Sequence, residues 1–234
     1  MRVLAIGDIH GCSRALDYLL AAVGLRSSDL IITLGDYVDR GPNSAAVLDR
    51  LIHLREKHKV VCLRGNHEQL MLQARRGHDR FVEWVHSGAR ATLASYAHQN
   101  GKVTLRDIPQ THWHFLEADC VDWHETETHL FVHAGIDPAL PMDQQPDHIL
   151  RWQRFADPQP HHSGKVMVCG HTRQRNGTPN NMGHAICIDT GAYRQGWLSC
   201  LEATTGYLWQ TTETGEFRSG WLKDFATKGA VEVY

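Results

Sequence analysis

The sequence lacks any long apolar run and has no large excess of charge of one sign. Its 234 residues are 42% hydrophobic and 21% charged, and the formal net charge is -2. The longest apolar runs are much shorter than a helix that crosses a bilayer. The charge balance gives no basic footprint for nucleic acid or for an anionic membrane. We therefore expect neither a membrane protein nor a nucleic-acid-binding protein.

The six cysteines include no CxxC pair. A chain of this length can build a full apolar core without disulfides, so we interpret the cysteines as buried, reduced thiols. Residues 1–7 reach Asp8 too soon for the apolar stretch of a signal peptide. These features predict a cytoplasmic protein, which we expect to be a monomer with one domain over residues 1–234.

Short apolar segments alternate with amphipathic ones in the first half of the chain. The segments that predict buried strands are residues 2–6, 30–34 and 60–63, and those that predict helices are residues 13–23, 45–55 and a segment from about residue 68. Ser13 is a candidate N-cap for the first helix. Strand–helix–strand units of this length imply parallel strands with helical crossovers.

The second half begins helical, between residues 77 and 116, with Pro109 suited to a helix start. Strands are then predicted at residues 120–124, 130–132, 166–169, 185–188, 198–201 and 207–210. Two proline-rich segments, residues 137–147 and 157–164, predict loops, and the tail from Gly215 has no clear period. Parallel units followed by a strand-rich half predict two sheets with helices outside them, an α/β sandwich.

Polar side chains follow five of the predicted strands, and glycine flanks each group. The five segments are GDIHG at residues 7–11, GDYVDRG at 35–41, GNHE at 65–68, HAG at 133–135 and GHT at 170–172. One such segment alone is also explained by a turn. Five in succession, each with a side chain that can bind metal, favour one site at the carboxyl edge of the strands, where ligands bind in α/β sheets.

The metal-binding side chains of these segments are carboxylate, amide and imidazole, without cysteine. This mixture suits Mn, Fe, Zn or Co, whereas an all-oxygen set would favour Mg or Ca. Six ligands exceed the three or four that one catalytic zinc uses. Two divalent ions bridged by one carboxylate fit better, and such a pair activates water for hydrolysis.

In this order, the five motifs resemble the signatures of the phosphoprotein phosphatase family of metallophosphatases. The short chain resembles bacteriophage lambda phosphatase and the bacterial serine/threonine protein phosphatases in particular. The resemblance, over residues 7–172, implies a four-layer α-β-β-α sandwich of the calcineurin-like metallophosphoesterase type. It also implies metal-dependent hydrolysis of phosphomonoesters, in phosphoproteins or small phosphoesters.

Two other functions compete with this interpretation. Symmetrical dinucleoside tetraphosphate hydrolases and polyphosphate hydrolases share the scaffold, and the motifs do not identify the substrate. A non-catalytic protein that recognises phosphate would require a missing catalytic group, and none is missing from the motifs.

The resemblance implies a role for each residue of the site. The metal ligands would be Asp8, His10, Asp36, Asn66, His133 and His171. Asp36 would bridge the two ions, for which Mn is the first expectation. His67 would protonate the leaving oxygen and Asp39 would orient it. Arg40 and Arg154 would bind the phosphate, with Arg154 favoured over the neighbouring Arg151.

The sequence departs from the family pattern after the GHT motif. Relatives often have proline where this chain has Arg173, and Arg175 follows two residues later. Either these arginines contact substrate or they are only solvated, and both interpretations stay open. His184 precedes another apolar strand, but the family places its ligand in GHT, so we interpret His184 as structural.

Overall fold

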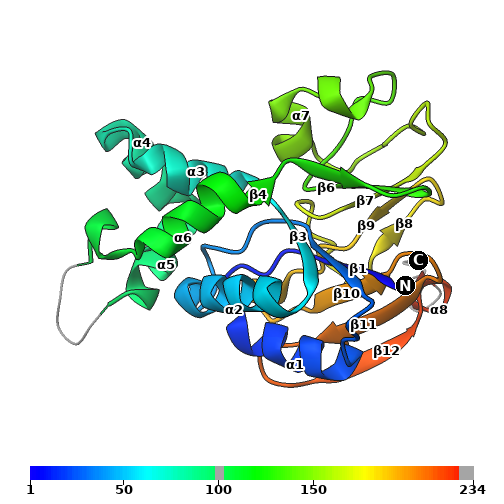
Figure 1. Cartoon of the computed structure of the whole chain (residues 1–234), viewed down its shortest axis with the longest axis horizontal. Coiled ribbons are helices and arrows are strands. Elements are labelled where there is room, and N and C mark those ends of the chain that lie inside the picture. The colour runs from blue at the N-terminus through cyan, green and yellow to red at the C-terminus, as the bar shows by residue number, and fades with distance from the viewer. Residues whose placement is uncertain (98–102, 227–234) are drawn as a thin grey trace, which may run out of the picture.

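The structure is a computed structural model that describes residues 1–97 and 103–226, and it contains two β-sheets with helices outside them (Figure 1). The strands are β1 (Val3–Ile6), β2 (Leu30–Thr33), β3 (Lys59–Leu63), β4 (Cys120–Val121), β5 (Trp123–Glu125), β6 (His129–Val132), β7 (Val166–Cys169), β8 (Asn180–Asn181), β9 (Ala185–Cys187), β10 (Leu198–Glu202), β11 (Tyr207–Thr211) and β12 (Phe217–Trp221). The α-helices are α1 (Ser13–Val23), α2 (Ser44–Lys57), α3 (Asn66–Ala74), α4 (His78–Trp84), α5 (Arg90–Ser95), α6 (Gln110–His114), α7 (Asp147–Trp152) and α8 (Leu222–Ala226). Shorter helical turns lie at Val85–Ala89, Leu105–Asp107, Phe115–Asp119, Met142–Gln144 and Ala192–Arg194.

The first sheet has seven strands in the order β12-β11-β10-β1-β2-β3-β4. Strands β1 to β4 pair in parallel, and β10 to β12 continue the sheet in antiparallel pairs. The second sheet has five strands in the order β5-β6-β7-β9-β8, with β6, β7 and β9 parallel. The parallel strands of both sheets follow the predicted crossovers, so their carboxyl ends form shared edges.

Alternating side chains of the strands divide the core into separate layers. In β1, Val3 and Ala5 pack between the two sheets, whereas Leu4 and Ile6 pack against the helices. Residues between the sheets include Ile32, Phe131, Val168 and Leu201. Residues between the first sheet and its helices include Leu16, Leu19, Leu48 and Leu51. The outer face of the second sheet buries Val132 and Met167, which share an apolar cluster with Leu150 of α7. Three apolar layers thus separate four layers of structure, and the predicted α-β-β-α sandwich is confirmed.

The first helices form where the apolar spacing predicts them. Helix α1 buries Leu16 and Leu19 on one face and ends at Val23. The next residue, Gly24, has a φ of 58°, in the left-handed region that glycine adopts without strain. The predicted N-cap was wrong: Ser13 is the first helical residue, and no side chain caps this helix. Helix α2 is capped instead by Asn43, whose side chain accepts a hydrogen bond from the backbone N–H of Ala46.

Some predicted elements differ from those observed. The strand expected at 120–124 is two strands, since β4 pairs with the first sheet and β5 with the second. Helix α7 directly follows the predicted loop 137–147 and was not predicted. The tail from Gly215 forms β12 and α8, and residues 227–234 lie outside the described residues, as do residues 98–102 of the predicted helical middle.

The six cysteines are free and buried, as expected for reduced thiols. Within the described ranges 1–97 and 103–226, none of the helices has the length and apolar character required to cross a membrane.

Candidate metal centre

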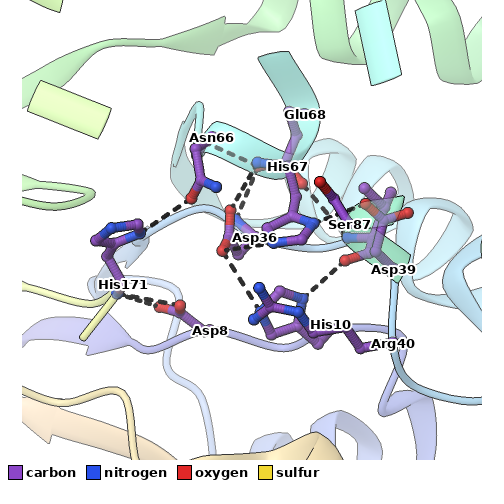
Figure 2. Close-up of polar contacts among 12 residues, drawn as sticks. Asp8, His10, Asp36, Asp39, Arg40, Asn66, His67, Glu68, Ser87 and His171 are labelled. Carbon is purple, nitrogen blue, oxygen red and sulfur yellow. Dashed lines mark hydrogen bonds and ion pairs between the residues drawn. The ribbon is translucent and has the colours of Figure 1, made fainter. Parts of the chain in front are cut away.

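The motif residues of both sheets meet at the carboxyl ends of the parallel strands. Four of these residues lie in the loop that follows a strand: Asp8 after β1, Asp36 after β2, His133 after β6 and His171 after β7. Asn66 is the first residue of α3, which follows β3. Figure 2 shows Asp8, His10, Asp36, Asn66 and His171 turned toward a common centre. Apart from partly buried His171, the ligands predicted from the sequence are buried. The structure therefore brings together all six of them.

Asp36 lies in the middle of this arrangement. Its Oδ2 is 3.4 Å from His10 Nε2, and its Oδ1 is 3.4 Å from His133 Nε2. Two groups of side chains can each hold a metal ion, one formed by His10, Asp36 and His67, the other by Asp36, His133 and His171. Because the groups share Asp36, its carboxylate is placed to contact an ion on either side.

Asn66 completes the second group. Its Oδ1 lies 2.9 Å from His133 Nε2 and 3.0 Å from His171 Nδ1, so these three atoms face one another beside the Asp36 carboxylate. An amide oxygen and two imidazole nitrogens converging on one point are the donors that a borderline divalent ion accepts.

Backbone carbonyls fix the imidazole rings of the candidate ligands. The Nδ1 of His10 lies 2.8 Å from the carbonyl oxygen of Val38, and the Nδ1 of His133 lies 2.7 Å from that of Leu34. If each Nδ1 donates its proton to the carbonyl, each Nε2 keeps a lone pair toward the centre. Burial lowers the pKa of both rings, and it lowers the pKa of His171 to about 4. Neutral imidazole is the form that binds metal.

Buried carboxylates crowd the other side of the centre. Asp8 is 3% exposed, and its oxygens accept the backbone N–H of His171 at 3.0 and 3.1 Å. Burial, together with the charges of Asp189 and Asp36, raises its pKa well above the usual range. Buried carboxylates without a cationic partner are costly. The donor set therefore fits divalent ions, although Asp8 lies outside the two compact groups named above.

The second aspartate of GDYVDRG has different surroundings. Asp39 Oδ2 lies 2.7 Å from His67 Nδ1. Trp84 Nε1 donates to both oxygens of Asp39 at 3.0 and 3.1 Å, and Thr92 Oγ1 donates to Oδ1 at 2.6 Å. Burial opposes the charged form of His67, but Asp36 and Asp39 outweigh it and raise the pKa of the ring. His67 and Asp39 thus form the pair that the sequence predicted.

Glu68 was quoted in the GNHE motif but given no role, and the structure supplies one. Its carboxylate accepts the backbone N–H groups of Asp36 at 2.8 Å, Tyr37 at 2.7 Å and Gly65 at 2.8 Å. One buried side chain therefore joins the loop after β2 to the loop after β3. The sequence contained a signal for this role, because Glu68 lies three residues after the helix N-cap Gly65, which is the spacing of a capping box.

The backbone is strained at several predicted site residues. Non-glycine residues with positive φ include His10 (46°), Asp36 (52°), Asp39 (72°), Arg40 (69°) and His171 (62°). Such conformations cost free energy and persist where the surrounding structure imposes them, often at functional sites. Glycines make room for the carboxylates: a Cβ on Gly65 would lie 2.2 Å from Asp36 Oδ1.

A cavity of about 660 Å³ opens over the centre and is lined by Arg40, Asn66, His67, His86, Ser87, Gly88, Trp152, Tyr193 and Arg194. The Arg40 guanidinium lies over the Tyr193 ring, 5.0 Å from its centroid, with Nη1 2.8 Å from His10 Nε2. Arg40 thus lies at the mouth of the centre, and its role in phosphate binding stays a prediction. Tyr193 and Arg194 were not predicted, and no motif in the sequence marked them.

The second predicted phosphate-binding arginine does not line this cavity. Arg154 is exposed, and its guanidinium makes no hydrogen bond or ion pair within the described part of the chain. Its role stays a prediction. Arg151 is buried, forms an ion pair with Asp147 at 3.0 Å and hydrogen-bonds Asp122, so it is committed to structure. His184, interpreted as structural, places its Nε2 2.7 Å from the carbonyl oxygen of Pro158.

The chain matches a known protein family and individual proteins whose functions are named. The model of the calcineurin-like phosphoesterase family matches residues 1–185. A symmetrical bis(5'-nucleosyl)-tetraphosphatase of Acidovorax sp. is 46% identical over 78 residues, which are 33% of this chain and 27% of that protein. Serine/threonine-protein phosphatase 1 of Salmonella typhimurium is 31% identical over 156 residues, 66% of this chain and 64% of that protein.

Among solved structures, a cold-active protein-tyrosine phosphatase of Shewanella superposes with a TM-score of 0.62 at 19% identity, covering 93% of this chain and 80% of that one. At this identity the likeness supports the fold alone. The matched segments span less than two thirds of each of the two sequence relatives.

Proposed function

The chain belongs to the calcineurin-like phosphoesterase family, and on this basis we propose that it is a metal-dependent phosphomonoester hydrolase whose leading substrates are serine/threonine phosphoproteins. One observation carries the proposal: Asp36 is shared between two metal-competent groups, and the His67–Asp39 pair adjoins them. The Salmonella relative, a serine/threonine-protein phosphatase, supports this substrate class.

Two divalent ions, with Mn as the first expectation, would be held by six side chains. Asp36 would be common to both ions, with Asp8 and His10 on one side and Asn66, His133 and His171 on the other. When bound, they would supply neutralisation of phosphate charge and activation of a water.

The chain's own residues would bind the phosphate and handle the proton. Arg40 would grip two phosphate oxygens with its planar fork, since its guanidinium lies at the cavity over Tyr193. His67 would hold a proton on Nε2, because its Nδ1 is engaged by Asp39 at 2.7 Å. That Nε2 proton would pass to the leaving oxygen as the P–O bond breaks. No serine or cysteine nucleophile is required.

A second candidate is the symmetrical cleavage of dinucleoside tetraphosphates. It is favoured by the 46% identity to the Acidovorax tetraphosphatase, a higher identity than to the Salmonella phosphatase, although over a shorter segment. The same centre would serve both reactions, because each displaces an oxygen leaving group from phosphorus.

The test is a substrate profile of the metal-stripped protein before and after Mn is restored. Release of phosphate is measured from p-nitrophenyl phosphate, a phosphoserine peptide and inorganic polyphosphate, and formation of ADP is measured from diadenosine tetraphosphate. Turnover of the first two that requires metal, with Mn better than Mg or Ca, supports the proposal. Preference for diadenosine tetraphosphate supports the second candidate, and no turnover of any substrate contradicts both. The Asp36→Asn variant is the control for contaminating phosphatases.

A further inference from the structure

A second, smaller cavity adjoins the catalytic one. This annex, as we name it, has a volume of about 190 Å³ and is lined by Arg173, Gln174, Arg175, Asn176, Gly177, Thr190, Gly191, Arg194, Gln195, Gly196 and Trp197. Arg194 lines both cavities, so the annex opens directly beside the place where a phosphate would meet Arg40. Its residues come from the segment after β7 and the segment between β9 and β10. Its position places it on the same substrate-facing side as the metal centre.

The side chains that line the annex carry positive charge, and the buried Asp189, which interacts with Arg173 through its charge, does not line it. The guanidinium groups of Arg173, Arg175 and Arg194 form no ion pair and no hydrogen bond with any residue of the described ranges. No aspartate or glutamate of the described residues lines the annex or the catalytic cavity. Arginines elsewhere are often paired, as Arg2 is with Asp29 and Arg55 with Asp119. Three unpaired arginines around one hollow leave their donors available to an anion.

Packing holds the walls of the annex in place. Gly191 has a φ of 76°, and a Cβ there would lie 2.8 Å from Arg173 Cδ, so glycine lets this side chain lie against the backbone. At two other lining residues, the Arg218 guanidinium lies 4.2 Å from the centroid of the Trp197 ring and donates to the carbonyl oxygen of Gly177 at 2.6 Å. The hollow is therefore formed before any ligand enters.

We propose that the annex binds a second, non-reacting phosphoryl group of a substrate whose first phosphate lies in the catalytic cavity. A phosphoryl group carries up to two negative charges and several oxygens, and it can accept from more than one guanidinium fork. A carboxylate carries one charge, and a single arginine matches it. The substrate class is thus a molecule with two phosphoryl groups close together. This inference rests on the proposed function of the adjoining site.

The test uses the double variant Arg173→Ala/Arg175→Ala. Arg194 is left intact because it also lines the catalytic cavity. The matched control is Arg26→Ala, an exposed arginine in the segment before β2, at the opposite end of that strand from the site. Values of kcat/KM are measured for five substrates. Two carry one phosphate only: p-nitrophenyl phosphate and a peptide with one phosphoserine. Two are versions of that peptide with either glutamate or a second phosphoserine placed two residues from the first phosphoserine, and the fifth is diadenosine tetraphosphate.

The double variant should leave kcat/KM for the two substrates with one isolated phosphate unchanged. It should lower kcat/KM by about tenfold for a substrate with a second phosphoryl group, since charge-assisted hydrogen bonds are lost. A loss confined to the doubly phosphorylated peptide or to diadenosine tetraphosphate identifies the source of that group, and either supports the proposal.

Three results would overturn it. An equal loss on p-nitrophenyl phosphate would assign the arginines to the reacting phosphate or to the shape of the cavity. An equal loss on the glutamate peptide would make the annex a carboxylate site. No loss on any substrate would leave the arginines merely solvated. In each case the wild-type protein still hydrolyses p-nitrophenyl phosphate. Rejecting the annex as a binding site therefore does not reject the proposed phosphomonoester hydrolase function.

Discussion

Asp36 and Asp39 lie three residues apart in one loop, but their surroundings differ in kind. Asp36 faces the rings of His10 and His133 at 3.4 Å, and burial lowers the pKa of both rings. Asp39 instead accepts hydrogen bonds from Trp84 and Thr92 and holds His67, whose pKa is raised. One region keeps its imidazoles neutral and the other favours imidazolium.

The difference fits the two tasks that we propose for this loop. Neutral rings around a shared carboxylate suit metal ions. A ring that keeps its proton beside an ionised partner suits general acid catalysis. The positive φ of both aspartates, 52° and 72°, turns their side chains to these separate neighbours. Variants that affect one region and spare the other test this division.

The largest effect is expected for Asp36→Asn. An amide bridges two cations poorly, so this variant should lose bound metal and nearly all activity. Asp8→Asn should be milder, because Asp8 would contact only one ion. Activity and metal content of the two variants are compared after reconstitution with Mn. Full metal content in Asp36→Asn would show that the bridge is wrongly assigned.

His67→Asn should lose rate in proportion to how poor the leaving group is. General acid contributions are about 10²–10⁴-fold, so a phosphoserine peptide should lose that much. p-Nitrophenyl phosphate needs less protonation of its leaving group and should lose less. The ratio of kcat values on the two substrates is the readout, and equal losses on both would argue against an acid at this position.

Asp39→Asn should shift the pH profile as well as the rate. The acid must be protonated, so activity falls as pH rises through the pKa of His67. Burial lowers that pKa, and the charges of Asp36 and Asp39 raise it more. Removing the Asp39 charge should therefore move the alkaline limb of kcat to lower pH, with a smaller loss of rate than in His67→Asn. An unmoved alkaline limb would mean that another group titrates there.

The smallest effect is expected for Arg154→Ala. The side chain is exposed and unpaired within the described residues, so its loss should raise KM for phosphomonoesters by about tenfold at most and leave the fold intact. Arg151→Ala should do the reverse: it should lower the melting temperature, because the buried Arg151 side chain loses its packing, its ion pair with Asp147 and its hydrogen bond to Asp122, while KM changes little. A KM effect from Arg151 alone would transfer the role to that residue.

The first half of the fold was predictable because its signals are local. Apolar spacing and glycine turns place β1, α1, β2 and α2 within a few residues of their observed bounds, and each motif directly follows a strand. The division of residues 120–125 between two sheets was not predictable, because β4 and β5 find their partners in different sheets, β3 and β6. Strand pairing of this kind depends on tertiary contacts.

The candidate site shows the same limit. The ligands and the His67–Asp39 pair follow from motifs, but the residues that hold them are distant in the chain. Thr92 reaches Asp39 from α5, and Tyr193 reaches Arg40 from a turn before β10. Neither has a local sequence signal. The exposed position of Arg154 is likewise set by where the chain leaves α7 rather than by its spacing from Trp152.

The division between the two aspartates depends most on His67, because its ring also belongs to the group that includes His10 and Asp36, with Nε2 3.9 Å from Asp36 Oδ2. The direct test is the metal content of His67→Asn, measured by elemental analysis beside wild type after reconstitution with Mn. We predict two ions per chain in both proteins. One ion in His67→Asn against two in wild type would make His67 a metal ligand and rule out the separate role proposed for the His67–Asp39 pair.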